Sequence, residues 1–357
     1  MTYYDVQVLE NLKTKKETNI MALVVGNDSN NNPNNKSYER ALAAKMQLVL
    51  DQPESDITAK LCNNDFEGDF FRIGDTVTIV KPNIESVDVQ IGSLTGANSG
   101  ANLDRKLEAS DLQFTSQYMT IDKTIKYAFL VSDVNEAEGK WNYESGGLDL
   151  AAQKTRKKLN MDMCNLIVND AAIQAQTATT LGTPTAPLTV TADELYSKVI
   201  VNIYAQLFNE GAITADGSYT FGSNSQQSKQ ISAGIFMPME AFTQLLIGKY
   251  FTSRSTTAAD NKIETANIKQ VLGMDVAIEP ALSPKSAEHV TVSGLAEGAF
   301  MIVAGTKNTV TEAKKVLPPE KQRSRERFAD EYHGMTIFGR KVISPESAVV
   351  AFVKLAQ

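Results

Sequence analysis

The sequence contains few of the side chains that most often carry out chemistry. Among its 357 residues there are two cysteines, two histidines and one tryptophan. His289 and His333 lie in separate segments, and neither has a cysteine or a second histidine at the spacing of a zinc site. A zinc centre or a histidine-dependent triad would therefore need an unusual convergence of distant segments.

Other signatures of catalysis are also missing. Gly248-Lys249 is followed by Tyr250, where a phosphate-binding loop needs serine or threonine. Neighbouring carboxylates such as Asp330 and Glu331 fall in predicted solvated turns, where we expect no acid–base role. We therefore predict that the protein is not an enzyme and has no catalytic residue, cofactor or metal site.

Long apolar runs and an excess of positive charge are absent as well. No stretch approaches the ~18 apolar residues that span a bilayer, and the N-terminus lacks the basic and apolar regions of a signal peptide. We expect folding in a cytoplasm, where Cys62 and Cys164 stay reduced and Cys164 packs as a small core residue. The net charge of −7, from 35 basic and 42 acidic residues, opposes strong direct binding to DNA or to an anionic membrane.

The sequence does have 42% hydrophobic residues, enough for a sizeable core or two subdomains, and clear strand patterns between residues 70 and 131. After a turn at Gly74-Asp75, a β-branched run ends at Pro82, which cannot donate a ladder hydrogen bond. Residues 121–131 alternate with a period of two and predict the returning strand of a β-ribbon. A long polar loop lies between them, and loops of this length are usually functional or disordered.

A long amphipathic helix is predicted after Gly146-Gly147. Apolar residues recur there at spacings of three and four, so the helix would run from Leu148 to about Ala175 and extend ~40 Å. A basic cluster lies beside the apolar stripe. The simplest interpretation of the cluster is the solvated face of an ordinary core helix.

A second subdomain is predicted from about residue 190. Residues 191–194 have the pattern of a capped helix start, and this helix would run to about Asn209. Residues 211–230 predict an exposed connection, residues 233–238 a short apolar strand, and residues 239–246 a helix. Further strands are predicted at residues 300–304, 335–338, 341–343 and 349–355, with turns at Gly334, Gly339 and Pro345.

Three segments carry a resemblance to a known family. They are the run that starts at Gly74-Asp75, the strand that ends with Tyr127–Val131 followed by Ser-Asp133-Val-Asn-Glu-Ala137, and the helix that contains Leu159-Asn-Met-Asp162. In this order they resemble the major capsid proteins of tailed bacteriophages, which share the HK97-like capsid fold. The order of the pieces extends over nearly the whole chain.

The resemblance implies an α+β fold with a division into five parts. These are an N-terminal arm (1–60), an extended β-loop (61–131), a peripheral domain with a long spine helix (132–190), an axial domain (191–330) and C-terminal strands that return to the core (331–357). Residues 27–35 are a polar run that cannot order itself by burial, so we expect the arm to gain order against a neighbouring subunit, the alternative being a flexible linker with a capping helix.

The resemblance also implies a function. The chain would self-assemble, as pentamers and hexamers, into the icosahedral head shell that encloses the double-stranded DNA of a tailed phage without sequence-specific binding. It would be assembled in the bacterial host cytoplasm and found in the virion, with portal, scaffold and possibly decoration proteins as partners and no membrane.

Candidate inter-subunit residues follow from the reaching loop, the basic helix face and the basic segment 314–327. For that last segment a solvated face or an inter-subunit contact is favoured over a nucleic-acid patch, because acids are interspersed and arginine pairs well with carboxylates across interfaces. The candidates are Lys81, Pro82, Asp104, Arg105, Lys106, Lys154, Arg156, Lys157, Arg323, Arg325 and Arg327.

Two alternative functions remain open at the level of sequence. An encapsulin-like nanocompartment shell resembles the same fold but encloses cargo enzymes instead of DNA. A monomeric enzyme or binding module with an irregular α+β fold would need a deep pocket with convergent polar groups, for which the sequence offers no candidate cluster.

Deletion of residues 96–103 tests the role of the predicted loop. We expect a soluble, folded subunit that assembles poorly, because the loop adds little to the core but reaches a neighbour. Sedimentation and circular dichroism of the deletion variant measure assembly and folding separately. Shells like those of the unmodified chain would contradict the assignment.

Overall fold

The computed structural model describes residues 56–65, 74–82, 114–133, 143–221, 229–248 and 269–356. The arm before residue 56 and the loop candidates Asp104, Arg105 and Lys106 lie outside these ranges. Residues 57–60, which the sequence predicted as part of the arm, instead belong to α3 (Ile57–Leu61), whose Ile57 and Leu61 are fully buried.

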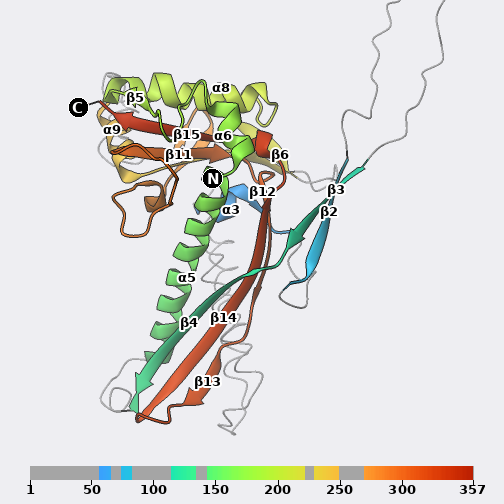
Figure 1. Cartoon of the computed structure of the whole chain (residues 1–357), viewed down its shortest axis with the longest axis vertical. Coiled ribbons are helices and arrows are strands. Elements are labelled where there is room, and N and C mark those ends of the chain that lie inside the picture. The colour runs from blue at the N-terminus through green and yellow to red at the C-terminus, as the bar shows by residue number, and fades with distance from the viewer. Residues whose placement is uncertain are drawn as a thin grey trace, which may run out of the picture.

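The body of the molecule is built on a six-stranded sheet with the order β5-β15-β11-β8-β10-β9 (Figure 1). Its strands are β5 (Leu188–Val190), β15 (Ala348–Leu355), β11 (Ala299–Gly305), β8 (Gly234–Met237), β10 (Met274–Ile278) and β9 (Gln270–Val271). All seven residues of β11 are buried, because apolar clusters cover both faces of this sheet. Such a strand shows a continuous apolar run in place of alternation.

Helices cover both faces of the body sheet. One face carries α7 (Ala192–Glu194), the π-helical segment η2 (Leu195–Ile200), α8 (Val201–Asn209) and α9 (Met239–Ile247). The other carries α3, the end of α5 (Tyr143–Val168) and α6 (Ala171–Thr177), with the short helices η3 (Pro280–Leu282) and η4 (Pro345–Ser347) nearby. The body therefore has three layers, with the sheet in the middle.

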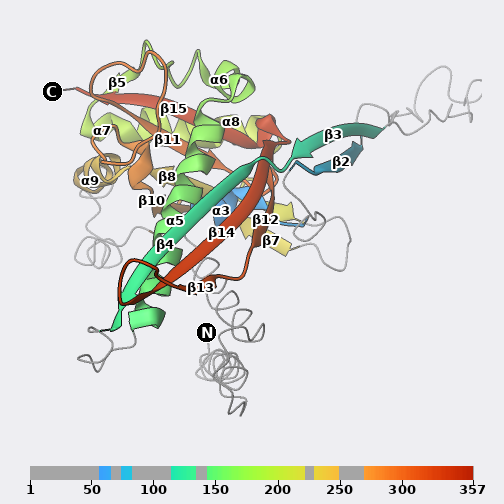
Figure 2. The ribbon, with the colours of Figure 1, turned by 60° about the horizontal axis from the view of Figure 1, so that its bottom comes forward.

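A second, long sheet extends away from the body, with α5 running along it (Figures 1 and 2). Its centre is β14 (Ala329–Val342), which pairs with β4 (Lys123–Ser132) along one edge and with β12 (Val310–Val316) and β13 (Glu320–Arg323) along the other. The two-residue strand β1 (Cys62–Asn63) adds to β12. We call these five strands the long sheet.

Two tail predictions are corrected by β14. The turns predicted at Gly334 and Gly339 are wrong, because both glycines lie inside this one continuous strand. A Cβ on Gly334 would come 2.1 Å from the Tyr127 ring, and one on Gly339 would come 2.6 Å from the carbonyl oxygen of Thr120. These glycines thus make room for close neighbours and do not bend the chain.

The β-ribbon is present, but its returning strand was predicted wrongly. β2 (Thr76–Pro82) pairs with β3 (Phe114–Thr120), whereas the predicted partner, residues 121–131, forms most of β4 and pairs with β14. The predicted alternation of that segment is confirmed, since Ile125 and Tyr127 pack toward α5 while Thr124 and Lys126 are exposed. The periodicity identified the strand and its faces, but not its partner.

The predicted spine helix is divided into two helices. α5 begins at Tyr143, before the Gly146-Gly147 pair, and ends at Val168; α6 starts anew after Asp170, whose carboxylate accepts hydrogen bonds from the backbone N–H groups of Ala172 and Ile173. Gly147 lies in the helix because the Phe129 ring occupies the place of its Cβ, 2.6 Å away. A helix without a break to residue 175 is therefore incorrect.

The predictions for the second subdomain are largely confirmed. The capped start at Thr191 is present, with the Glu194 carboxylate accepting from the Thr191 backbone N–H at 3.3 Å. The strand at β8 and the helix at α9 are also found. The region 211–230 is more ordered than expected, because β6 (Ser218–Phe221) and β7 (Lys229–Ser232) form a two-stranded ribbon there.

Substitution of Gly339 tests how closely the connection from β3 to β4 passes over β14, and substitution of Gly146 on α5 is its control. Gly339→Ala should lower the free energy of unfolding by about 1–3 kcal/mol, because its Cβ would meet backbone atoms of Thr120 and Ile121. Gly146→Ala is the matched control, since nothing lies within 4 Å of its Cβ and alanine favours a helix by about 0.5–1 kcal/mol. Denaturant unfolding measures both, and equal effects would contradict the close crossing.

Candidate assembly surfaces

A buried ion pair fixes the long sheet to α5. Arg340 on β14 and Glu312 on β12 face each other in the ladder, and both side chains have no exposed surface. Arg340 Nε donates to Glu312 Oε1 at 2.8 Å, and Arg340 Nη1 donates to the carbonyl oxygen of Leu159 at 2.5 Å. One guanidinium therefore joins two strands to the middle of the helix.

The ion pair extends outward through Asp162. Its carboxylate lies 3.5 Å from Arg340 Nη1 and accepts a hydrogen bond from Lys123 Nζ at 2.7 Å. Because Lys123 begins β4, the helix is connected to three strands of the long sheet through this one group of charges. The long sheet and α5 therefore form a single rigid unit, called the rigid arm below to distinguish it from the N-terminal arm.

Both cysteines lie in the apolar cluster that packs α3 and α5 against the body sheet. Burial raises the pKa of the Cys62 thiol well above its usual value, and Glu312 raises it further. Burial likewise raises the pKa of Cys164, which packs in the core as predicted. Both remain free, so protonated and unreactive thiols are expected.

The ribbon exposes large apolar side chains on its outer face. Its inner face, with Val77, Ile79 and Met119, packs on the long sheet opposite α5. On its outer face Tyr118 is 61% exposed and Phe114 59% exposed. Figure 1 shows the far end of β2 and β3 standing clear of the rest of the fold.

The turn between β13 and β14, residues 324–328, forms the tip of the long sheet. Arg323 donates to Asp133 with both Nη atoms and to Asp330 at 3.0 Å, so it joins the ends of β4, β13 and β14. Hydrogen bonding from Arg323 lowers the pKa of Asp133. Burial acts to raise the pKa of Asp330, but hydrogen bonds from Lys321 and Arg323 outweigh it, and the net shift is downward. These contacts are present above the ordinary aspartate range and are lost as the pH falls through the lowered values.

The predicted site residues do not form one cluster. On α5, Lys154 and Lys157 are exposed, whereas Arg156 Nε contacts the Asp56 carboxylate at 3.1 Å within the same chain. At the tip, Arg323 is exposed but pairs with Asp133 and Asp330 of the same chain, and Arg325 and Arg327 are also exposed. Lys81 and Pro82 lie in β2, where only their backbone is described. The inter-subunit roles of all the candidate residues stay predictions.

Three exposed apolar side chains were missed by the sequence analysis. Phe114 and Tyr118 belong to β3, where apolar and polar residues do not alternate regularly, so periodicity did not point to them. Phe328, at the tip, is 83% exposed. It stands alone in a charged segment, where no periodicity could have predicted its position.

The residues that the structure describes contain no group of three or more histidine, cysteine, aspartate or glutamate side chains placed to hold a metal ion. Nor does any helix among them have the length and apolar character needed to cross a membrane. His289 Nδ1 lies 2.9 Å from the carbonyl oxygen of Ser286, and His333 Nε2 lies 3.3 Å from Glu331. Both imidazoles thus have local structural partners.

Substitution at the buried ion pair tests its importance for the arm. Arg340→Met should cost about 3–5 kcal/mol of unfolding free energy, because Glu312 is left charged and buried without its partner. The double variant Arg340→Met/Glu312→Leu should recover much of this loss. Denaturant titration of the three proteins gives the comparison, and a double variant as unstable as the single one would contradict the argument.

Comparisons with known proteins give matches among solved structures alone. No family model matches the chain, and no curated protein does. A structure titled Mycobacterium phage Che8 aligns over 83% of this chain and 90% of its own, with 15% identity and a TM-score of 0.53. The asymmetric unit of the bacteriophage PhiM1 mature capsid aligns over 83% of this chain and 85% of its own, with 13% identity and a TM-score of 0.48.

A third match is the virus-like particle from Pyrococcus furiosus. It covers 87% of this chain and 98% of its own, with 10% identity and a TM-score of 0.44. Of these three matches, the phage Che8 chain has a TM-score above 0.5 and aligns over most of both chains, which supports a shared fold. The chain therefore has the α+β fold that its sequence predicted, and the similarity to a phage protein that the sequence resemblance implied is confirmed at the level of the fold.

Proposed function

We propose that this protein is the major capsid protein of a tailed bacteriophage, which self-assembles into an icosahedral shell around double-stranded DNA. The observation that carries the proposal is the ribbon, an outlying two-stranded element that exposes two aromatic side chains. A monomer gains nothing from Phe114 and Tyr118 in water, whereas a shell subunit can bury them on a neighbour.

The rest of the fold suits a shell subunit. A shell subunit must keep its shape while many modest contacts form around it. The rigid arm of α5 and the long sheet meets this requirement because the buried Arg340–Glu312 pair holds it together. The ribbon is attached firmly to this arm, since Lys341 Nζ donates to the carbonyl oxygen of Tyr118 at 3.0 Å. A reaching element with a rigid base loses less entropy on docking.

The charge of the chain fits containment of DNA without tight binding. With a net charge of −7, the subunit would leave a confined polymer free to move, because it does not neutralise many phosphates. Portal, scaffold and possibly decoration proteins would act with it, and assembly in the host cytoplasm would precede its place in the virion.

The first test is the assembly state of the protein expressed alone and with any scaffold encoded nearby. Negative-stain microscopy and sedimentation should reveal closed particles, rings or tubes. Particles from infected cells should contain DNA; particles filled with a cargo protein would favour a nanocompartment shell instead. A stable monomer under every condition would contradict both shells.

A single substitution tests the ribbon surface. Tyr118→Asp should reduce particle yield at least about tenfold, because a charge would have to be buried at the contact while the monomer core is untouched. Tyr118→Phe is the matched control and should assemble normally. Sedimentation measures particle yield and circular dichroism checks the fold. Normal particles from the aspartate variant would contradict a role for this face.

A further inference from the structure

The tip of the long sheet carries an aromatic side chain that its own fold leaves in water. Phe328 is 83% exposed, more than any other large apolar residue in the described parts of the chain. Its backbone is not loose, because its carbonyl oxygen accepts a hydrogen bond from Asp133 N at 3.1 Å. On either side of it, Ser324 N donates to Ala329 O, and Ala329 N to Arg327 O.

The bidentate contact of Arg323 with Asp133 adds a second restraint on this turn. Phe328 is therefore presented on an ordered support, and little conformational entropy remains to be lost when it is buried. An exposed aromatic ring on a rigid base is the kind of group that anchors protein interfaces.

The same sheet contains a hollow of about 410 Å³ that could receive such a ring. Its apolar lining comes from Ala128 on β4, Met335 on β14 and Leu317-Pro318 after β12. It lies on the face of the sheet that points away from α5, because Lys126 and Ala128 alternate with the α5-facing Ile125 and Tyr127. A closed apolar cavity of about 150 Å³ holds a benzene ring, so this hollow has room for a phenylalanine side chain.

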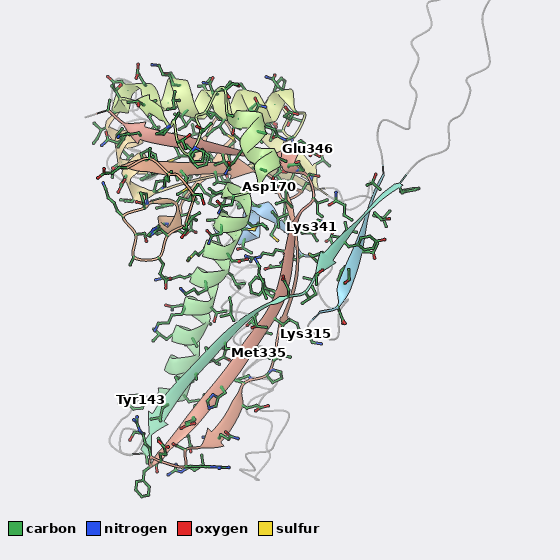
Figure 3. The ribbon with its side chains drawn as sticks, in the orientation of Figure 1. Tyr143, Asp170, Lys315, Met335, Lys341 and Glu346 are labelled. Atoms are coloured by element: carbon green, nitrogen blue, oxygen red, sulfur yellow. The ribbon has the colours of Figure 1, made fainter. Side chains whose placement is uncertain are left out.

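Phe328 cannot fill the hollow of its own chain. Met335 lies seven residues farther along the extended strand β14, or about 20 Å at the usual rise per residue. Figure 3 shows Met335 partway along the long sheet, well away from its lower end. The ring must therefore come from another copy if the two are to meet.

The charges around the hollow and around the tip are complementary, each sign at one having the opposite sign at the other. Glu320 and Lys126 both line the hollow. The tip carries Arg325, Arg327 and Glu326, all exposed. Each charged group at the hollow thus has a partner of opposite sign at the tip, which favours one orientation of docking.

We propose that Phe328 of one subunit inserts into the hollow formed by Ala128, Leu317-Pro318 and Met335 of a neighbouring copy, with Arg325 or Arg327 paired to the neighbour's Glu320. Tip and hollow are different surfaces, so the contact is heterologous and forms a ring when the rotation closes. The proposal rests on the proposed shell function and names a contact within it.

Site-directed cross-linking tests the contact in assembled particles. The double variant Phe328→Cys/Ala128→Cys is treated with a short bismaleimide, and denaturing gels should show covalent dimers and larger rings. The native Cys62 and Cys164 are fully buried and do not compete. Phe328→Cys/Thr189→Cys is the matched control, because Thr189 is exposed on β5, in the body. It should give no such ladder.

The possible results separate the two proposals. Absence of particles from the unmodified chain contradicts the shell itself, and the contact falls with it. Particles without cross-links in the first double variant contradict only the docking of Phe328. A ladder from the control, or from Phe328→Cys alone, would show that the tip meets a different surface and would overturn the proposal equally.

A second readout avoids cysteine. Phe328→Ala should raise the protein concentration needed for assembly about tenfold, while Phe328→Leu should retain most of the effect of the ring. The side chain touches solvent rather than the core, so both variants should fold. An alanine variant that assembles at the same concentration as the unmodified protein would contradict the anchor.

Discussion

The ion pair between Arg340 and Glu312 is the interaction on which the extended shape of this molecule depends. A narrow sheet with one helix along it has little interior, and it would not keep a fixed direction by apolar packing alone. The guanidinium joins β12, β14 and a carbonyl oxygen in the middle of α5, in a place without exposed surface. The cost of leaving any of these groups alone makes one arrangement of helix and sheet strongly preferred.

The same arm fixes the position of the outlying parts. The chain passes directly from β3 to β4 across Gly339, where there is no room for a side chain, so the base of the ribbon is pressed against β14. At the opposite end, Arg323 joins the tip to Asp133, which follows β4 and lies 190 residues away in sequence. The outward-facing apolar groups are thus carried by ordered supports at both ends of one rigid element.

This distribution of surface chemistry suits assembly better than catalysis. Several ion pairs among the described residues join elements of the fold, such as Lys123 on β4 with Asp162 on α5 and Lys321 on β13 with Asp330 on β14. The two most exposed aromatic residues that the structure describes stand at the extremities, Tyr118 on the ribbon and Phe328 at the tip. Under the proposed function, buried charge supplies shape, and exposed apolar area would supply the drive for contact between copies.

Much of the fold was predictable from local pattern, because burial on one face leaves a period in the sequence. Alternation in residues 121–131 indicated β4, the apolar runs indicated β11 and β15, and the capping pattern at Thr191 marked a helix start. For the candidate site, the inter-subunit roles of the basic residues of α5 and the tip stay predictions. Within the chain, Arg156 contacts Asp56 and Arg323 contacts Asp133. The exposed Phe114, Tyr118 and Phe328 were not among the candidates, because no sequence periodicity pointed to them.

Sequence by itself therefore determined the elements, their inward faces and the scarcity of catalytic groups. Only the tertiary structure decided which strands pair, why Gly334 and Gly339 lie within a strand, and that Arg340 is buried. The physical reason is that alternation reports which face of a strand is covered and carries no information about what covers it. Partner choice and burial of a lone side chain depend on contacts between segments far apart in the chain.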